Sequence, residues 1–221
     1  SRNDLVGDQC LRQAIKGDVL SKKRPKRRSR DSKAAEPAVL ESDGLNSNVV
    51  IGALIAFALI VRLYYLSLTS DQPVWWDEAN YLVKAKSFAL GTPETGYDSG
   101  RPILFSLLMA PFFSVGLGEF GIRLVISLCS VATVYLTYRI GEKLVSSWAG
   151  IFAAAAFSCQ YLNLFYTQRV MCEIPYVMMA LLGVLFFLSE RRELVWASGP
   201  CFAVAVMLRY PAFAIPVAVL C

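Results

Sequence analysis

Residues 48–68, "NVVIGALIAFALIVRLYYLSL", are the feature that most restricts what this chain can fold into. A helix needs about 20 mostly apolar residues to cross a bilayer, and Arg62 is the only charge in this run. The run is too long for the apolar core of a cleaved signal peptide, so we expect an uncleaved membrane anchor. Four later apolar runs, of which the third is short, also predict crossings: 122–140, 148–166, 174–189 and 195–221. The sequence therefore predicts an all-α membrane protein, a polytopic bundle of about five spanning helices.

The apolar run 101–118, "RPILFSLLMAPFFSVGLG", is ambiguous, because it is short and contains two prolines. The distribution of Lys and Arg distinguishes the two topologies, since these residues collect in cytoplasmic loops. If the run does not cross, the basic turns "YRIGEK" and "ERRE" fall on the same side as the basic cluster 22–30. If it does cross, only Arg123 and Arg169 are left on that side. We therefore predict that 69–121 is a large outer loop that contains amphipathic surface helices.

Residues 1–47 differ in composition from the rest of the chain. They hold 11 Lys/Arg and 7 Asp/Glu, so most of the net charge of +5 lies in this segment. A segment this polar cannot bury enough apolar surface to fold alone. We predict a basic, disordered cytoplasmic tail over 1–47, joined to a transmembrane body over 48–221. The basic run 22–30 then lies near anionic lipid headgroups, and we expect no nucleic-acid partner.

The chain contains no histidine. This excludes histidine-based catalytic triads, histidine general bases and most zinc sites. The six cysteines show no C-x-x-C spacing, and most lie inside apolar runs, so we interpret them as small apolar side chains. Catalysis in this chain has to use carboxylates, arginine, lysine, tyrosine or thiols.

The predicted outer loop begins with two tryptophans and two adjacent carboxylates, Asp77 and Glu78. The segment 77–91, "DEANYLVKAKSFALG", predicts one amphipathic helix that ends at Gly91, and the tryptophans suit a membrane–water interface. Its apolar stripe consists of Tyr81, Leu82, Ala85, Phe88 and Ala89.

Two interpretations of the acidic pair stay open on the residues alone. In the structural one, Asp77 is an N-cap and Glu78 a first-turn acid that complements the helix dipole. In the functional one, a carboxylate at the membrane edge is a general base that deprotonates a hydroxyl acceptor. A water-poor site increases the basicity of such a carboxylate.

A second acidic position lies in the short outer segment 165–176, "FYTQRVMCEIPY". Arg169 and Glu173 are four residues apart, so they can form a structural ion pair on one helical turn. Alternatively, the planar guanidinium of Arg169 binds a phosphate, and Glu173 positions a substrate or binds a metal.

Two arginines lie inside predicted spans. Arg62 is within two turns of its helix end, so we expect its side chain to extend toward the membrane surface. Arg209 lies deeper, and an ionisable residue at that depth is a functional candidate by default.

The segment that starts at "WWDEANY" and continues through "GRPILF" and "GEFGIRL" resembles the membrane-embedded type-C glycosyltransferases. The nearest group contains the protein O-mannosyltransferases and the bacterial lipid A aminoarabinose transferase. Three features carry the likeness: the Asp-Glu pair with Ala-x-Tyr after the first helix, a proline-led apolar surface helix, and the Gly118 to Arg123-Leu124 motif that opens the next span. The likeness covers about residues 48–190.

The resemblance implies roles for particular residues. Asp77 corresponds to the catalytic base of that family and Glu78 to the neighbouring acid, while Arg169 and Glu173 correspond to the arginine and the acid of the second loop. Tyr81 and Arg101, which belong to the matching motifs, are then further substrate-binding candidates.

The resemblance also implies the reaction. We expect a polyprenyl- or dolichyl-phosphate sugar as donor substrate and a hydroxyl on a protein, lipid or glycan as acceptor. No cofactor is assigned, and a divalent metal is left open. The membrane is either the plasma membrane of a prokaryote or that of the endoplasmic reticulum. The competing hypothesis is a non-catalytic membrane protein, such as a transporter or a complex subunit.

Overall fold

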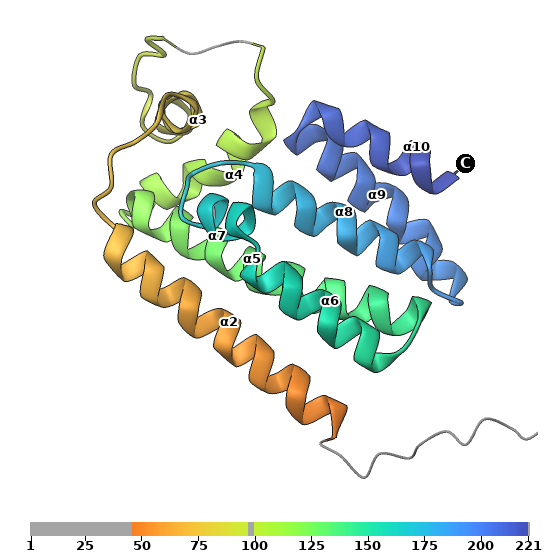
Figure 1. Ribbon diagram of the computed structural model, residues 1–221. Helices are drawn as coiled ribbons and strands as arrows, with labels where there is room; N and C mark the ends of the chain where they lie inside the picture. The colour runs from red at the N-terminus through yellow and green to blue at the C-terminus, as the bar shows by residue number, and fades with distance from the viewer. Residues whose placement is uncertain (1–45, 97–99, 221) are drawn as a thin grey trace, which may run out of the picture. The chain divides into compact units, whose positions relative to one another are not determined.

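The computed structural model describes residues 46–96 and 100–220, and every element of secondary structure in these ranges is a helix (Figure 1). They belong to a unit that spans residues 44–221. The predicted tail lies, up to residue 45, outside the described residues. The prediction of an all-α membrane protein is confirmed. The helices are α2 (Ser47–Thr69), α3 (Trp76–Leu90), α4 (Ile103–Ser114), α5 (Gly118–Leu144), α6 (Ser147–Cys159), α7 (Tyr161–Thr167), α8 (Glu173–Phe187), α9 (Arg192–Leu208), η1 (Tyr210–Phe213) and α10 (Ala214–Leu220).

Helices α2 and α5 are each long and apolar enough to cross a membrane. The predicted span 148–166 is not one straight helix: α6 and α7 meet at an angle of 59°, and together they pass the same test as a bent pair. The break falls at Gln160, whose backbone is extended. Helix α8 is apolar but has 15 residues. Length and composition thus support up to three of the five predicted crossings among the described residues.

The last predicted span, 195–221, is also interrupted. Helix α9 ends at Leu208, Arg209 is extended, and the short helices η1 and α10 follow. Arg209 is the C-cap of α9, and Pro211, two residues later, cannot continue the α-helix because it has no backbone N–H to donate. The break holds the Arg209 side chain at the end of α9.

Helices α3 and α4, which belong to the predicted outer loop, pack against each other (Figure 1). Helix α3 ends as predicted, with Gly91 in a left-handed conformation at φ 67°. Helix α4 has 12 residues, or about 18 Å of helix, which is too short for a hydrocarbon core of about 30 Å. The prediction that this segment does not cross therefore agrees with its length. On α3, Tyr81, Leu82 and Ala85 of the predicted stripe are buried, whereas Phe88 is exposed.

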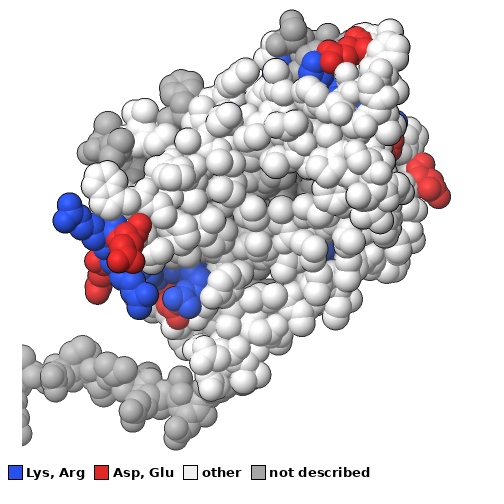
Figure 2. All heavy atoms as spheres, turned by 180° about the vertical axis from the view of Figure 1, so that it is seen from behind, with Lys and Arg blue, Asp and Glu red and all other residues white. Residues whose placement is uncertain are grey.

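The spanning helices place their ends in two groups. At one end, Arg123 in α5 donates from Nη1 to the carbonyl of Thr69 at the end of α2 (2.8 Å). At the other, Lys143 in α5 donates from Nζ to the carbonyl of Leu188 after α8 (3.3 Å). Figure 2 likewise shows separate groups of charged side chains with uncharged surface between them. We call the end that carries α3 and α4 the loop end and the opposite one the basic end.

The Arg62 side chain does not extend to the membrane surface, so that expectation is wrong. It is fully buried between α2, α5 and α6. Its Nε donates to Ser130 Oγ (2.7 Å), and its Nη1 donates to the Ala58 carbonyl (3.1 Å) and lies 3.5 Å from Ser158 Oγ. These oxygens replace the water that a charged group at the membrane surface would have had.

Two glycines, Gly141 and Gly150, lie against each other where α5 and α6 pack together. A Cβ built on Gly150 would lie 2.5 Å from the Tyr138 carbonyl oxygen and 2.9 Å from the Glu142 nitrogen. Both neighbours are backbone atoms of α5, which cannot move aside without disturbing the helix. The hairpin of α5 and α6 therefore requires glycine at this crossing.

Replacement of Gly150 by alanine is expected to lower the free energy of unfolding by about 1–3 kcal/mol, because an overpacked contact forces backbone shifts. The matched control is Gly52→Ala in α2, where an added Cβ meets nothing within 4 Å. Thermal unfolding of the purified chain in detergent measures both variants. Equal midpoints for the two variants would contradict the packing assigned to this crossing.

Candidate functional site

The acidic pair occupies the first turn of α3. Trp75 is the N-cap, so Asp77 and Glu78 are the second and third residues of the helix. The interpretation of Asp77 as the N-cap is therefore wrong. Both carboxylates lie where the helix dipole favours negative charge, as the structural interpretation expected.

Glu78 is fully buried and joins two segments of the loop end. Its Oε2 accepts a hydrogen bond from the Trp75 backbone nitrogen (2.7 Å) and one from Arg169 Nη1 (3.2 Å). Its Oε1 accepts from the Val170 backbone nitrogen (2.7 Å). The first bond caps α3, and the other two hold the segment between α7 and α8. We call this arrangement the Glu78 latch.

Arg169 is the cationic member of the latch. Its Nη1 also donates to the Pro73 carbonyl (3.1 Å), and its guanidinium lies 4.2 Å from the Trp75 ring centroid and 5.5 Å from that of Phe165. The predicted structural pair of Arg169 with Glu173 is wrong, because Arg169 pairs with Glu78. Residues 169–172 are not helical, so the spacing of four does not place the two side chains on one helical face.

Asp77 takes no part in the latch and pairs with Arg101, which donates from Nη2 to Asp77 Oδ1. The guanidinium of Arg101 also lies 5.7 Å from the ring centroid of Tyr81. Partial burial opposes the charge on Arg101, but Tyr81 and Asp77 raise its pKa overall. The Asp77 side chain is 43% exposed, and no described residue donates to its Oδ2. One carboxylate oxygen is thus held by Arg101.

Tyr81 links the first loop to the start of α8. Its hydroxyl lies 3.3 Å from Cys172 Sγ, and Cys172 precedes Glu173. Burial raises the pKa of the Tyr81 hydroxyl above its usual value, and Cys172 adds to the shift. Burial, followed by the charge of Glu173, raises the pKa of the Cys172 thiol to about 11. Both groups are therefore neutral hydrogen-bonding partners at physiological pH.

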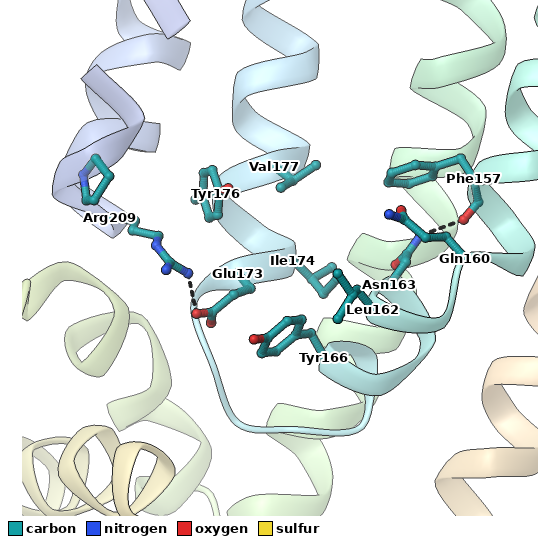
Figure 3. Close-up of a pocket in the computed structure, with 11 residues that line it drawn as sticks. Phe157, Gln160, Leu162, Asn163, Tyr166, Glu173, Ile174, Tyr176, Val177 and Arg209 are labelled. Atoms are coloured by element: carbon teal, nitrogen blue, oxygen red, sulfur yellow. Dashed lines mark hydrogen bonds and ion pairs between the residues drawn. The ribbon is translucent and has the colours of Figure 1, made fainter. Parts of the chain in front are cut away.

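Glu173 begins α8 and forms an ion pair with Arg209. Glu173 is the first residue of α8 and Arg209 directly follows α9, and Figure 3 shows the two side chains facing each other. The guanidinium of Arg209 lies 5.5 Å from the Tyr176 ring centroid. The structure thus makes Arg209 a member of the site.

A cavity of about 440 Å³ opens beside this pair (Figure 3). Most of the accessible surface of its wall is apolar, although six of its eleven lining residues carry a polar group, and this mixture suits a ligand site. The polar groups are Gln160, Asn163, Tyr166, Glu173, Tyr176 and Arg209, and the apolar ones are Phe157, Leu162, Ile174, Val177 and Pro211. We call this space the Arg209 cavity.

A second cavity of about 240 Å³ lies on the other face of α7. Tyr161, Leu164 and Phe165 line it, whereas Leu162, Asn163 and Tyr166 of the same helix line the Arg209 cavity. Arg169 belongs to the second cavity. The two residues predicted to meet the substrate in the second loop, Arg169 and Glu173, therefore face different spaces.

The described parts of the chain contain no cluster of side chains that could bind a metal ion. Among them, no three Cys, Asp or Glu side chains come together in a way that could hold a metal ion. The carboxylates of Asp77 and Glu173 are each paired with an arginine instead. A metal at Glu173 stays a prediction.

One protein-family model matches this chain. The model of the family described as dolichyl-phosphate-mannose-protein mannosyltransferase matches residues 100–221, which is more than half of the chain. The match includes Arg101, Arg169, Glu173 and Arg209 and begins after the acidic pair. No curated protein and no solved structure matches.

The Glu78 latch predicts a stability effect that separates the two adjacent acids. Glu78→Gln is expected to lower the free energy of unfolding by about 3 kcal/mol, because it leaves Arg169 unpaired and turns an amide donor toward a backbone N–H. The exposed neighbour gives the matched control, since Asp77→Asn is expected to change stability by less than about 1 kcal/mol. Thermal unfolding in detergent measures both. Equal losses for the two variants would refute the latch.

The raised pKa of Cys172 predicts slow alkylation. At pH 8 a thiol with a pKa of about 11 is ionised in roughly one molecule in a thousand, and the thiolate is the reactive form. Modification of Cys172 by iodoacetamide is expected to accelerate as the pH rises toward 11. Cys159 is exposed and provides the reference within the same sample, read by peptide mass spectrometry. Equal rates at pH 8 would contradict the assigned environment.

Proposed function

The chain belongs to the dolichyl-phosphate-mannose-protein mannosyltransferase family, and from this premise we propose that it transfers a sugar from a polyprenyl- or dolichyl-phosphate donor to a hydroxyl acceptor. It is an integral membrane protein and a glycosyltransferase of the mannosyltransferase type. Family membership favours this activity over the transporter or subunit alternatives. The acceptor is a hydroxyl of a protein, lipid or glycan.

The observation that carries the proposal is the convergence of both acidic segments at the loop end. Glu78 binds Arg169 and the backbone of Val170, and Tyr81 contacts Cys172. A base on the first loop and a cation near the second therefore share one end of the bundle. Placing an acceptor and a donor next to each other is the main requirement for group transfer.

We assign the general base to Asp77. Its Oδ2 takes the proton from the acceptor hydroxyl while the hydroxyl oxygen bonds to the anomeric carbon of the sugar. The bond between that carbon and the phosphate oxygen breaks, and the polyprenyl phosphate leaves with the electron pair as a stable anion. Arg101 holds Oδ1 and so orients the carboxylate. Glu78 positions the same turn of α3 and takes no proton.

We place the donor phosphate at Arg209. Its side chain is 40% exposed beside a largely apolar cavity, whereas that of Arg169 is 11% exposed and is already paired with a buried carboxylate. A guanidinium is well suited to phosphate, since it presents a planar set of donors. The apolar wall of the Arg209 cavity receives the first isoprene units. Glu173 balances the charge of Arg209 before the donor arrives, while donor binding by Arg169 stays a prediction from the sequence.

The basic end supports a proposal for the membrane side on which the reaction takes place. Arg139 and Lys143 lie in the last two turns of α5, Arg191 is the N-cap of α9, and Arg192 is its first residue. The hydrogen bond from Lys143 to Leu188 brings these turns together. Because basic residues collect in the cytoplasm, the loop end faces the outside of the cell or the lumen, and transfer takes place there.

Asp77→Asn is expected to reduce sugar transfer by about 10²–10⁴-fold, the usual contribution of a general base. Its matched control is Asp71→Asn, an exposed aspartate in the same loop, which is expected to keep the activity of the unchanged chain. The assay supplies dolichyl-phosphate mannose and other polyprenyl-phosphate sugars to the full chain in detergent and identifies products by mass. Near-normal turnover of the Asp77→Asn variant would contradict the assignment.

A further inference from the structure

Arg62 is a buried cation with no carboxylate partner among the described residues. Its hydrogen bonds go to two serine hydroxyls and one carbonyl, and its Nη2 is buried without a partner in the described part of the chain. A buried charge without a counter-ion is costly. An apolar side chain at this position would pack with less cost, so stability alone does not account for an arginine here.

The contacts of Arg62 lie on both sides of the break between α6 and α7. On the α6 side, Ser158 is two residues before Gln160. On the α7 side, Ser130 accepts from Arg62 and donates to Asn163 Oδ1 (2.9 Å). The Arg62 carbonyl also accepts from Gln168 Nε2 just after α7 (3.3 Å). Arg62 is therefore connected to the parts of the chain that flank the break.

This connection ends at the Arg209 cavity. Asn163 lines that cavity, and its Nδ2 donates to the Phe157 carbonyl across the break (3.2 Å). Thr167 donates to the Asn163 carbonyl (2.6 Å) and lies 2.9 Å from Ser130 Oγ, so the orientation of α7 is fixed through the same serine. A continuous set of hydrogen bonds thus runs from Arg62 through Ser130 to a cavity residue.

We propose that Arg62 is a positioning residue for the donor site: through Ser130 and Asn163 it fixes the angle between α6 and α7 and so the shape of the Arg209 cavity. This inference rests on the proposed function, since it assumes that the cavity receives the lipid-phosphate donor. Arg62 touches neither the reacting atoms nor the cavity. Its loss should therefore affect donor binding far more than turnover.

The test compares Arg62→Met and Arg62→Lys in the full chain in detergent. Binding of dolichyl phosphate without sugar is measured by native mass spectrometry, together with the donor KM and kcat for dolichyl-phosphate mannose. Arg62→Met is expected to raise Kd and KM about tenfold, the scale of coupling by residues that contact no ligand, with kcat within about twofold and with an unchanged or higher unfolding midpoint. Lysine keeps the charge but not the planar fork, so it should restore part of the loss.

A second pair of variants keeps the proposal testable if Arg62→Met does not fold. Ser127 and Ser130 are both fully buried in α5, but only Ser130 bonds to Arg62 and Asn163, whereas Ser127 Oγ has no partner among the described residues. Ser130→Ala is expected to weaken donor binding, and Ser127→Ala is expected to leave it unchanged.

The outcomes separate this inference from the proposed function. If the unchanged chain binds dolichyl phosphate and both serine variants bind it equally well, the positioning role is overturned while the function stands. A fall in unfolding midpoint and kcat with unchanged Kd and KM would also overturn it, because that pattern belongs to a purely structural residue. If the unchanged chain binds no polyprenyl phosphate, the proposed function fails and the inference fails with it.

Discussion

The buried carboxylate of Glu78 is the constraint on which the rest of the loop end depends. A charge removed from water is tolerated only when donors surround it. Here those donors are the backbone of Trp75 on one loop and the side chain of Arg169 and backbone of Val170 on another. The two loops cannot separate without leaving this charge unsatisfied. The latch therefore defines where α3 begins, and with it where Asp77 is held.

The geometry of α3 gives its two adjacent acids, Asp77 and Glu78, different environments. Successive residues of a helix point in directions about 100° apart, so the same turn that buries Glu78 presents Asp77 to Arg101 and the surface. One carboxylate is buried and structural, and the other is partly exposed and held at one oxygen by Arg101. The two cations differ in the same way: Arg169 is mostly buried in the latch, whereas Arg209 is more exposed, beside the Arg209 cavity. In each pair the less buried member is the one we assign to the chemistry.

The sequence predicted the helical membrane fold and the positions of α3 and α4, because these follow from local periodicity and length. It also predicted that the acidic segments share an end, since the bias of Lys and Arg reports topology. It did not predict the partners of the charges. Arg169 and Glu173 have helical spacing, but α8 begins only at Glu173, and their true partners lie far away in the chain. The burial of Arg62 was missed for a related reason, because its partners Ser130 and Ser158 come from other helices. The break between α6 and α7 at Gln160 was not predicted either, because no proline or glycine lies beside it in the sequence.

A double-mutant cycle between Glu78 and Arg169 tests the latch most directly. Unfolding midpoints are measured for Glu78→Gln, for Arg169→Met and for the chain with both changes, and are converted to free energies. If the two side chains form one buried pair, the loss in the double variant is smaller than the sum of the single losses by about 1–3 kcal/mol, because either change alone leaves a charge unpaired. Losses that add to within about 0.5 kcal/mol would show that the pair does not hold the two loops together and would contradict the account.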